Sequence, residues 1–178
     1  KLSTGKYVMP QPLEHRLAAE ALIDQAVVIG TGRKYCTALI FPSDSALRTL
    51  ARTYGLPADL PLPEYFGHPR VKRRFQELVD KANSGMDHWS TIKRFALIDE
   101  PLSVESGLLT PTLKVKRAAL AKEFEDEIDQ LYQQPEQQEH DGTPAGIGPQ
   151  HAVFFIKFIH EGSPYGTEDH QGEHGYRN

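Results

Sequence analysis

Apolar residues recur along the chain in patterns that predict both strands and helices. Two runs rich in strand-forming residues, QAVVIG at 25–30 and YCTALIF at 35–41, are separated by a short loop that contains Gly32. This arrangement predicts an antiparallel hairpin. A third strand is predicted from the run RFALID at 94–99.

Helical spacing of apolar residues predicts four helices around these strands. They are expected at 13–20, 43–54, 70–83 and 117–132, the last as one continuous helix. The proline-rich segment 56–69 is expected to be a loop. Because strands and helices interleave around a hairpin, we expect an α+β fold with a small, mainly antiparallel sheet flanked by helices.

The composition changes after Tyr132, where QQPEQQEHDGTPAGIGPQ is polar and rich in proline and glycine. Such a segment has little to bury. We therefore expect one domain at 1–132, followed at 133–178 by a linker and polar tail with a short strand at 152–159. His170 and His174 have the i, i+4 spacing of metal ligands on a helix, but the glycines around them disfavour a helix. No metal site is expected.

Charge and cysteine content narrow the class of protein. Residues 133–178 hold seven acidic and two basic residues, so residues 1–132 carry +1 of the net charge of −4. A nearly neutral body disfavours a nucleic-acid-binding protein. The single cysteine, Cys36, excludes an internal disulfide and is expected to be buried. No run could span a bilayer or serve as a secretory signal, so we expect a cytoplasmic protein, peripheral at a membrane at most.

The segment GLLTPTLKVKR at 107–117 carries the most informative polar residues. Lys114, Lys116 and Arg117 stand just before a predicted helix, where the helix macrodipole disfavours positive charge. This placement indicates that at least one of these cations serves an anion supplied from elsewhere. On charge alone, a solvated lysine is the more common alternative.

Two segments resemble a known family in order and spacing. LSTGKYVMPQPLE at 2–14 and GLLTPTLKVKR at 107–117 are similar to the C-terminal domain motifs of AMP-forming acyl-CoA synthetases, with long-chain fatty acid CoA ligases most similar. The segments between them resemble the intervening strands, so the resemblance covers about residues 1–132.

The resemblance implies a ligase that uses ATP, Mg2+ and coenzyme A, mostly bound by a larger N-terminal adenylation domain. The fatty acid carboxylate first attacks the α-phosphate of ATP to give acyl adenylate and pyrophosphate. The thiol of coenzyme A then displaces AMP. The small domain rotates between the two half-reactions and presents a different face to each.

The family's residue roles carry over to matching positions. Lys114 matches the catalytic lysine of the adenylation step, where a compact ammonium would offset repulsion between carboxylate and polyphosphate. Gly5 matches the glycine beside the pantetheine channel, where the lack of a side chain allows close approach. Thr4 and Lys6 flank it and are expected to touch the cofactor.

Glu14 matches a carboxylate of the first motif, which we interpret as structural. Lys116 and Arg117 are interpreted as accessory or structural. The basic clusters at 33–34 and 70–74 could meet phosphates of coenzyme A, but a solvated surface is favoured for them.

The chain departs from the family pattern at its start. It contains neither the phosphate loop nor the Asp-Arg hinge signature, so residue 1 falls almost on the hinge, as in an excised domain or a cleavage product. We expect this chain alone to make no acyl adenylate. The alternative is a stand-alone α+β module that binds a protein partner without catalysis.

Overall fold

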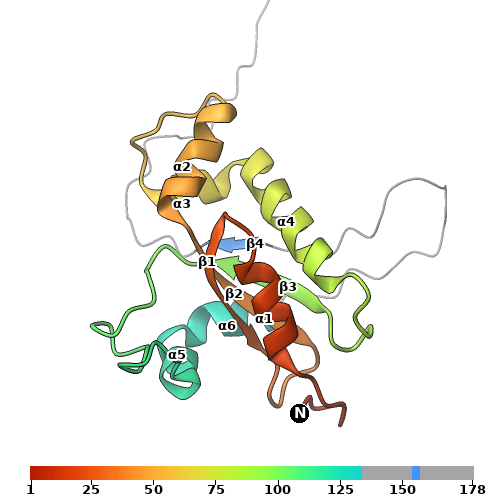
Figure 1. The fold of residues 1–178 in the computed structure, drawn as a ribbon. Helices are drawn as coiled ribbons and strands as arrows, with labels where there is room; N and C mark the ends of the chain where they lie inside the picture. Colours follow the sequence, from red (N-terminus) through yellow and green to blue (C-terminus); the bar gives the residue numbers. More distant parts are fainter. Residues whose placement is uncertain (134–153, 157–178) are drawn as a thin grey trace, which may run out of the picture.

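The computed structural model describes residues 1–133 and 154–156. Ten helices and strands lie within these ranges (Figure 1). In chain order they are α1 Pro10–Ala18, β1 Ile23–Ile29, β2 Cys36–Pro42, α2 Asp44–Thr53, α3 Leu62–Gly67, α4 Pro69–Asn83, β3 Ile92–Leu97, α5 Arg117–Glu123, α6 Glu125–Gln133 and β4 Phe154–Ile156.

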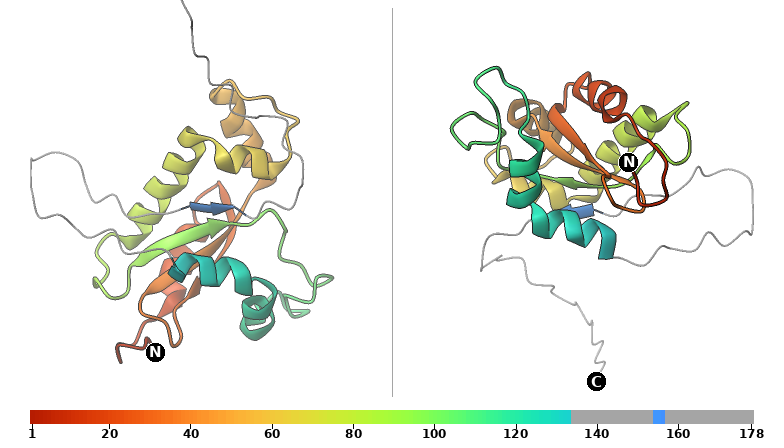
Figure 2. Two further views of the ribbon diagram at one scale, coloured as in Figure 1. Left: turned by 180° about the vertical axis from the view of Figure 1, so that it is seen from behind. Right: turned by 90° about the horizontal axis from the view of Figure 1, so that it is seen from below.

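The α+β class is confirmed, and the sheet is small with helices on both faces. Its strand order is β1-β2-β3-β4, and β1 pairs with β2 as the predicted antiparallel hairpin. The right-hand view of Figure 2 shows the sheet between α1 and α4 on one face and α5 and α6 on the other. Every residue of β2 is buried, as expected for a strand covered from both sides.

The prediction of a mainly antiparallel sheet is wrong, because β2 pairs with β3 in parallel and β3 pairs with β4 in parallel. The physical reason is the long connection through α2, α3 and α4. It returns the chain to the end of the sheet at which β2 begins, so β3 runs in the same direction as β2. Parallel neighbours need such a crossover, whereas a short loop can make only a hairpin. β4 covers residues 154–156 of the apolar run at 152–159. The rest of the predicted tail, including His170 and His174, lies outside the described residues.

Two helix predictions also need correction. The segment 56–69 is not all loop, since α3 forms within it and buries Tyr65 and Phe66. The predicted helix at 117–132 is divided at Phe124, whose backbone leaves helical geometry at φ −108° and ψ 34°. Phe124 is fully buried with its ring edge-on to Phe41, at a centroid distance of 5.9 Å. The bend therefore lets the second helix follow the sheet.

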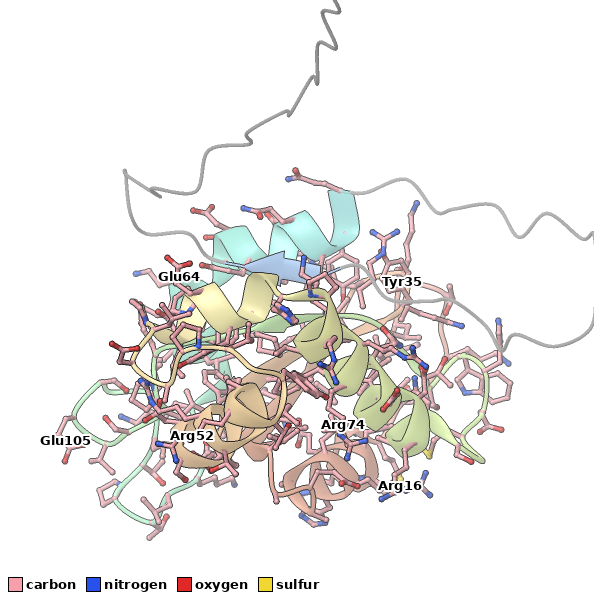
Figure 3. The ribbon with its side chains drawn as sticks, turned by 90° about the horizontal axis from the view of Figure 1, so that it is seen from above. Arg16, Tyr35, Arg52, Glu64, Arg74 and Glu105 are labelled. Atoms are coloured by element: carbon pink, nitrogen blue, oxygen red, sulfur yellow. The ribbon has the colours of Figure 1, made fainter. Side chains whose placement is uncertain are left out.

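Side chains from the sheet fix the end of α6. Arg94 and the Tyr35 hydroxyl both donate to the Leu131 carbonyl, at 2.9 and 3.0 Å, and Tyr35 lies beside this helix end in Figure 3. Such donors satisfy a carbonyl that has no partner within the helix. Burial raises the pKa of Tyr132 to about 12, so its hydroxyl remains a donor to the Tyr35 carbonyl at 2.9 Å.

The thiol of Cys36 is buried as predicted, and burial raises its pKa. A thiol in this state is a poor nucleophile, since the thiolate is the reactive form.

None of the helices among residues 1–133 is long and apolar enough to cross a bilayer.

Candidate functional site

Lys114 lies on a short hairpin in the loop between β3 and α5. The Thr110 amide donates to the Lys114 carbonyl at 2.8 Å, and the Lys114 amide donates to the Thr110 hydroxyl at 3.0 Å. The Leu113 amide closes the turn on the Thr110 carbonyl at 2.8 Å. The backbone of Lys114 is therefore held by two hydrogen bonds to Thr110 on the opposite arm of the hairpin.

This hairpin is attached to the core at its base. Leu109 and Val115 form an antiparallel bridge, and the Lys116 amide donates to the Leu108 carbonyl at 2.8 Å. Leu108 and Leu109 are both buried, and Leu108 packs in the core that α5 and α6 cover. Figure 3 shows Glu105 at the outer edge of the same loop, away from the sheet. The base of the hairpin is thus fixed, while residues 111–114 at its tip are exposed.

The Lys114 side chain is exposed. Within residues 1–133 its ammonium makes no hydrogen bond and no ion pair. Lys114 therefore has a fixed backbone and an ammonium without an internal partner. Such an ammonium can bind an anion carried by another domain, because it does not first have to leave an ion pair.

Arg117 joins the two motif segments of the sequence. Its guanidinium binds both carboxylate oxygens of Glu14, at 2.7 and 2.8 Å, and also donates to the Val28 carbonyl at 3.2 Å. Glu14 in turn accepts from the Val28 amide at 2.8 Å. The positive charge of Arg117 at the start of α5 is therefore balanced by Glu14 within the domain. These contacts agree with a structural role for both residues.

The N-terminal turn around Gly5 lies against the loop between β1 and β2. The Gly5 amide donates to the Leu2 carbonyl at 3.0 Å, and the Leu2 amide donates to the Lys6 carbonyl at 2.9 Å. The turn is held to the β1–β2 loop by the Ser3 amide, which donates to the Arg33 carbonyl at 2.9 Å. Gly5 has φ +85°, which favours glycine.

The surface beside Gly5 is open, because a Cβ atom added there would meet no atom within 4 Å. Thr4 and Lys6 are exposed on either side of it. The Lys6 ammonium lies 4.5 Å from the ring centroid of Trp89, a residue that the sequence patterns did not single out. A cation over an indole ring is a stabilising arrangement, so Trp89 steadies one side of the turn.

The two predicted sites are on different parts of the molecule. The loop that carries Lys114 and the N-terminal turn extend from different sides of the domain in both Figure 1 and the right-hand view of Figure 2. The Glu14–Arg117 ion pair joins the two motifs, whereas the N-terminal turn and the loop between β3 and α5 extend away from each other. The domain therefore presents two separate candidate surfaces.

Other features of the described residues do not add to these sites. A cavity of about 290 Å³ is lined by residues such as Gln25, Phe41 and Leu102, and by none of the predicted site residues. The described ranges contain no group of three His, Cys, Asp or Glu side chains that could hold a metal ion.

The basic clusters are mostly engaged within the domain. Arg33 forms an ion pair with Asp129, and Arg73 and Arg74 both contact Glu77, at 3.3 and 3.2 Å. Arg70 lies over the ring of Tyr54 at 4.1 Å. These contacts agree with the interpretation of the clusters as ordinary surface.

Comparison with known families decides what kind of domain this is. The family model described as "AMP-binding enzyme C-terminal domain" matches residues 1–136. This chain belongs to that family. The match includes both motifs, the strands β1 to β3 and the six helices of residues 1–133, whereas β4 lies beyond it.

Curated relatives of this chain include long-chain fatty acid CoA ligases. The ligase FadD15 of Mycobacterium tuberculosis is 31% identical over 128 residues, which cover 72% of this chain and 21% of the relative. Ligase 5 of Rattus norvegicus is 31% identical over 140 residues, which cover 77% of this chain and 20% of the relative. The chain thus spans about a fifth of the length of these relatives.

Solved structures show the same fold. The adenylation domain of a carboxylate reductase from Mycobacterium chelonae aligns with a TM-score of 0.59 at 24% identity, covering 74% of this chain and 19% of that one. An adenylation and carrier didomain of a carboxylic acid reductase from Segniliparus rugosus, solved with AMP, aligns with a TM-score of 0.56 at 23% identity, covering 74% and 17%.

Proposed function

We propose that this chain is the mobile C-terminal domain of an AMP-forming long-chain fatty acid CoA ligase. Joined to its N-terminal adenylation domain, it takes part in converting a fatty acid, ATP and coenzyme A into acyl-CoA, AMP and pyrophosphate. The observation that carries the proposal is Lys114, which is fixed through its backbone at the tip of an anchored hairpin while its ammonium is uncommitted.

In the adenylation step, a carboxylate oxygen of the fatty acid forms a bond to the α-phosphorus of ATP, and pyrophosphate leaves. Two anionic groups must meet for this bond to form. The Lys114 ammonium, placed between a carboxylate oxygen and an α-phosphate oxygen, would offset their repulsion and stabilise charge that develops on the phosphate. Mg2+, bound with the nucleotide by the N-terminal domain, would supply further charge neutralisation.

In the second step, the thiol of coenzyme A attacks the acyl carbon and AMP leaves. We assign this step to the surface around Gly5, with Thr4 and Lys6 beside the cofactor. The open space above Gly5 supports the assignment, because an extended pantetheine arm could pass close to the backbone there. The separation of the two surfaces supports a rotation of the domain between steps.

The proposal is tested by joining and separating the two domains. The purified 178-residue chain should show no fatty-acid-dependent exchange of pyrophosphate into ATP, because its sequence lacks the family's phosphate loop. Linked to the N-terminal domain from the same gene, it should give ATP- and CoA-dependent acyl-CoA formation. Exchange by the chain alone would overturn the proposal. A joined protein that is no faster than the N-terminal domain by itself would favour the protein-interaction module.

Gly5→Ala should slow thioester formation from supplied acyl adenylate by about tenfold, while adenylation is retained. The added methyl group meets nothing within the domain, so a loss in this half-reaction alone would report the approach of the cofactor. Rapid-quench measurement of the two half-reactions separates them.

The matched control is Gly55→Ala at the end of α2. Gly55 also has a positive φ, +76°, and open space around it, so alanine there brings similar backbone strain, about 1–2 kcal/mol, without a proposed ligand. Equal effects of the two substitutions on thioester formation would contradict the assignment of Gly5.

A further inference from the structure

Leu113, at the tip of the Lys114 hairpin, has an unusual backbone conformation. Its φ is +60°, and no other residue except glycine has a positive φ within residues 1–133. The five other positive-φ positions in that range are glycines. For a residue with a side chain, this left-handed conformation is disfavoured. Glycine, or asparagine, would suit the turn better.

The Leu113 side chain gains nothing within this domain that would offset the strain. It is 68% exposed, one of few large apolar side chains in the described residues that face solvent to this extent. A leucine that is both strained and exposed stabilises neither the turn nor the core. Strained conformations of this kind concentrate at functional sites.

The position of Leu113 indicates what it contacts. It is the residue next to Lys114, and the turn hydrogen bond from the Leu113 amide to Thr110 fixes both residues on one tip. A hairpin that brings Lys114 to reactants on another domain must bring Leu113 to the surface of the same domain. The neighbouring threonine hydroxyls bond to each other at 3.0 Å, so the exposed apolar side chains at this tip are those of Pro111 and Leu113, of which Leu113 is the larger.

We propose that Leu113 is a docking residue that inserts into an apolar recess of the N-terminal adenylation domain when Lys114 is presented for adenylation. This inference rests on the proposed function. Burial of the leucine contributes to closure, and it excludes water beside the ammonium, where the interaction with anions then becomes stronger. Leu113 is thus a positioning residue that acts through Lys114.

The test uses the ligase that contains both domains and three substitutions. Leu113→Gly and Leu113→Asn keep the left-handed turn but remove the apolar side chain, and each should lower the rate of adenylation by about 10- to 100-fold. Leu113→Met restores an apolar side chain of similar volume and should rescue most of the loss. Thioester formation from supplied acyl adenylate should be close to wild type in all three.

Thermal unfolding of the 178-residue chain supplies a readout that a purely structural role would not give. The melting temperatures of Leu113→Gly and Leu113→Asn should equal or exceed that of the wild type, because both residues tolerate φ +60°. Wild-type adenylation in these two variants would overturn the inference, and so would a lower melting temperature accompanying the lost activity. If Lys114→Ala is inactive while the Leu113 variants are normal, only the docking role fails and the proposed function stands.

Discussion

Replacing Lys114 by alanine in the two-domain ligase is expected to lower the rate of acyl adenylate formation by about 100- to 1000-fold. The ammonium is the exposed, uncommitted end of a side chain whose backbone is fixed by the Thr110 contacts. Its removal takes away charge where carboxylate and α-phosphate meet, so the loss falls on the transition state of this step. Thioester formation from supplied acyl adenylate should largely survive, because that step uses the other surface.

The control for this prediction is Lys116→Ala. Lys116 is exposed on the same loop and carries the same charge, so its removal changes the local net charge equally. It should leave both half-reactions near wild type. Equal losses in adenylation and thioester formation for Lys114→Ala would sink the assigned role, because they would indicate a damaged domain rather than a missing charge.

The local patterns of the sequence were sufficient for the hairpin and for most helices. Two strand-forming runs separated by a short loop that contains Gly32 correctly predicted the β1–β2 pairing. The spacing of apolar residues correctly located α2 and α4. The direction of β3 could not be read in this way, because it depends on how a connection of about fifty residues returns to the sheet. Nor does helical spacing reveal the bend at Phe124, which follows from the ring packing against Phe41.

The candidate site shows a similar limit. The two motifs indicated Lys114 and Gly5, but no spacing rule predicts that Glu14 and Arg117, separated by 103 residues, bind each other. Trp89 stands alone in a polar loop, and its contact with Lys6 exists only once the chain has folded. Leu113 reads as an ordinary apolar residue until its φ and exposure are known. Two of these features are contacts between distant segments, and the third is a local backbone conformation that the residue type does not suggest.

Replacing Glu14 by alanine is expected to lower the free energy of unfolding by about 2–4 kcal/mol. The Glu14 side chain is 14% exposed and accepts from both the Arg117 guanidinium and the Val28 amide. Alanine leaves that amide and a half-exposed guanidinium without their acceptor. Glu14→Gln should lose about half as much, because its amide oxygen can still accept from Val28. Urea denaturation of the 178-residue chain measures both.

Asp44→Ala provides the control, because Asp44 pairs with Arg48 at 2.8 Å on α2 but is 57% exposed; a surface pair of this kind contributes about 0–1 kcal/mol. A loss for Glu14→Ala no larger than this would show that Glu14 does not stabilise the two motifs.

If Glu14 does stabilise both motifs, its removal should also change the rates of both half-reactions. Glu14 and Arg117 hold the bases of both motifs, so Glu14→Ala should slow adenylation and thioester formation together. Lys114→Ala and Gly5→Ala should each slow only one, because each changes one surface and leaves the shared support intact.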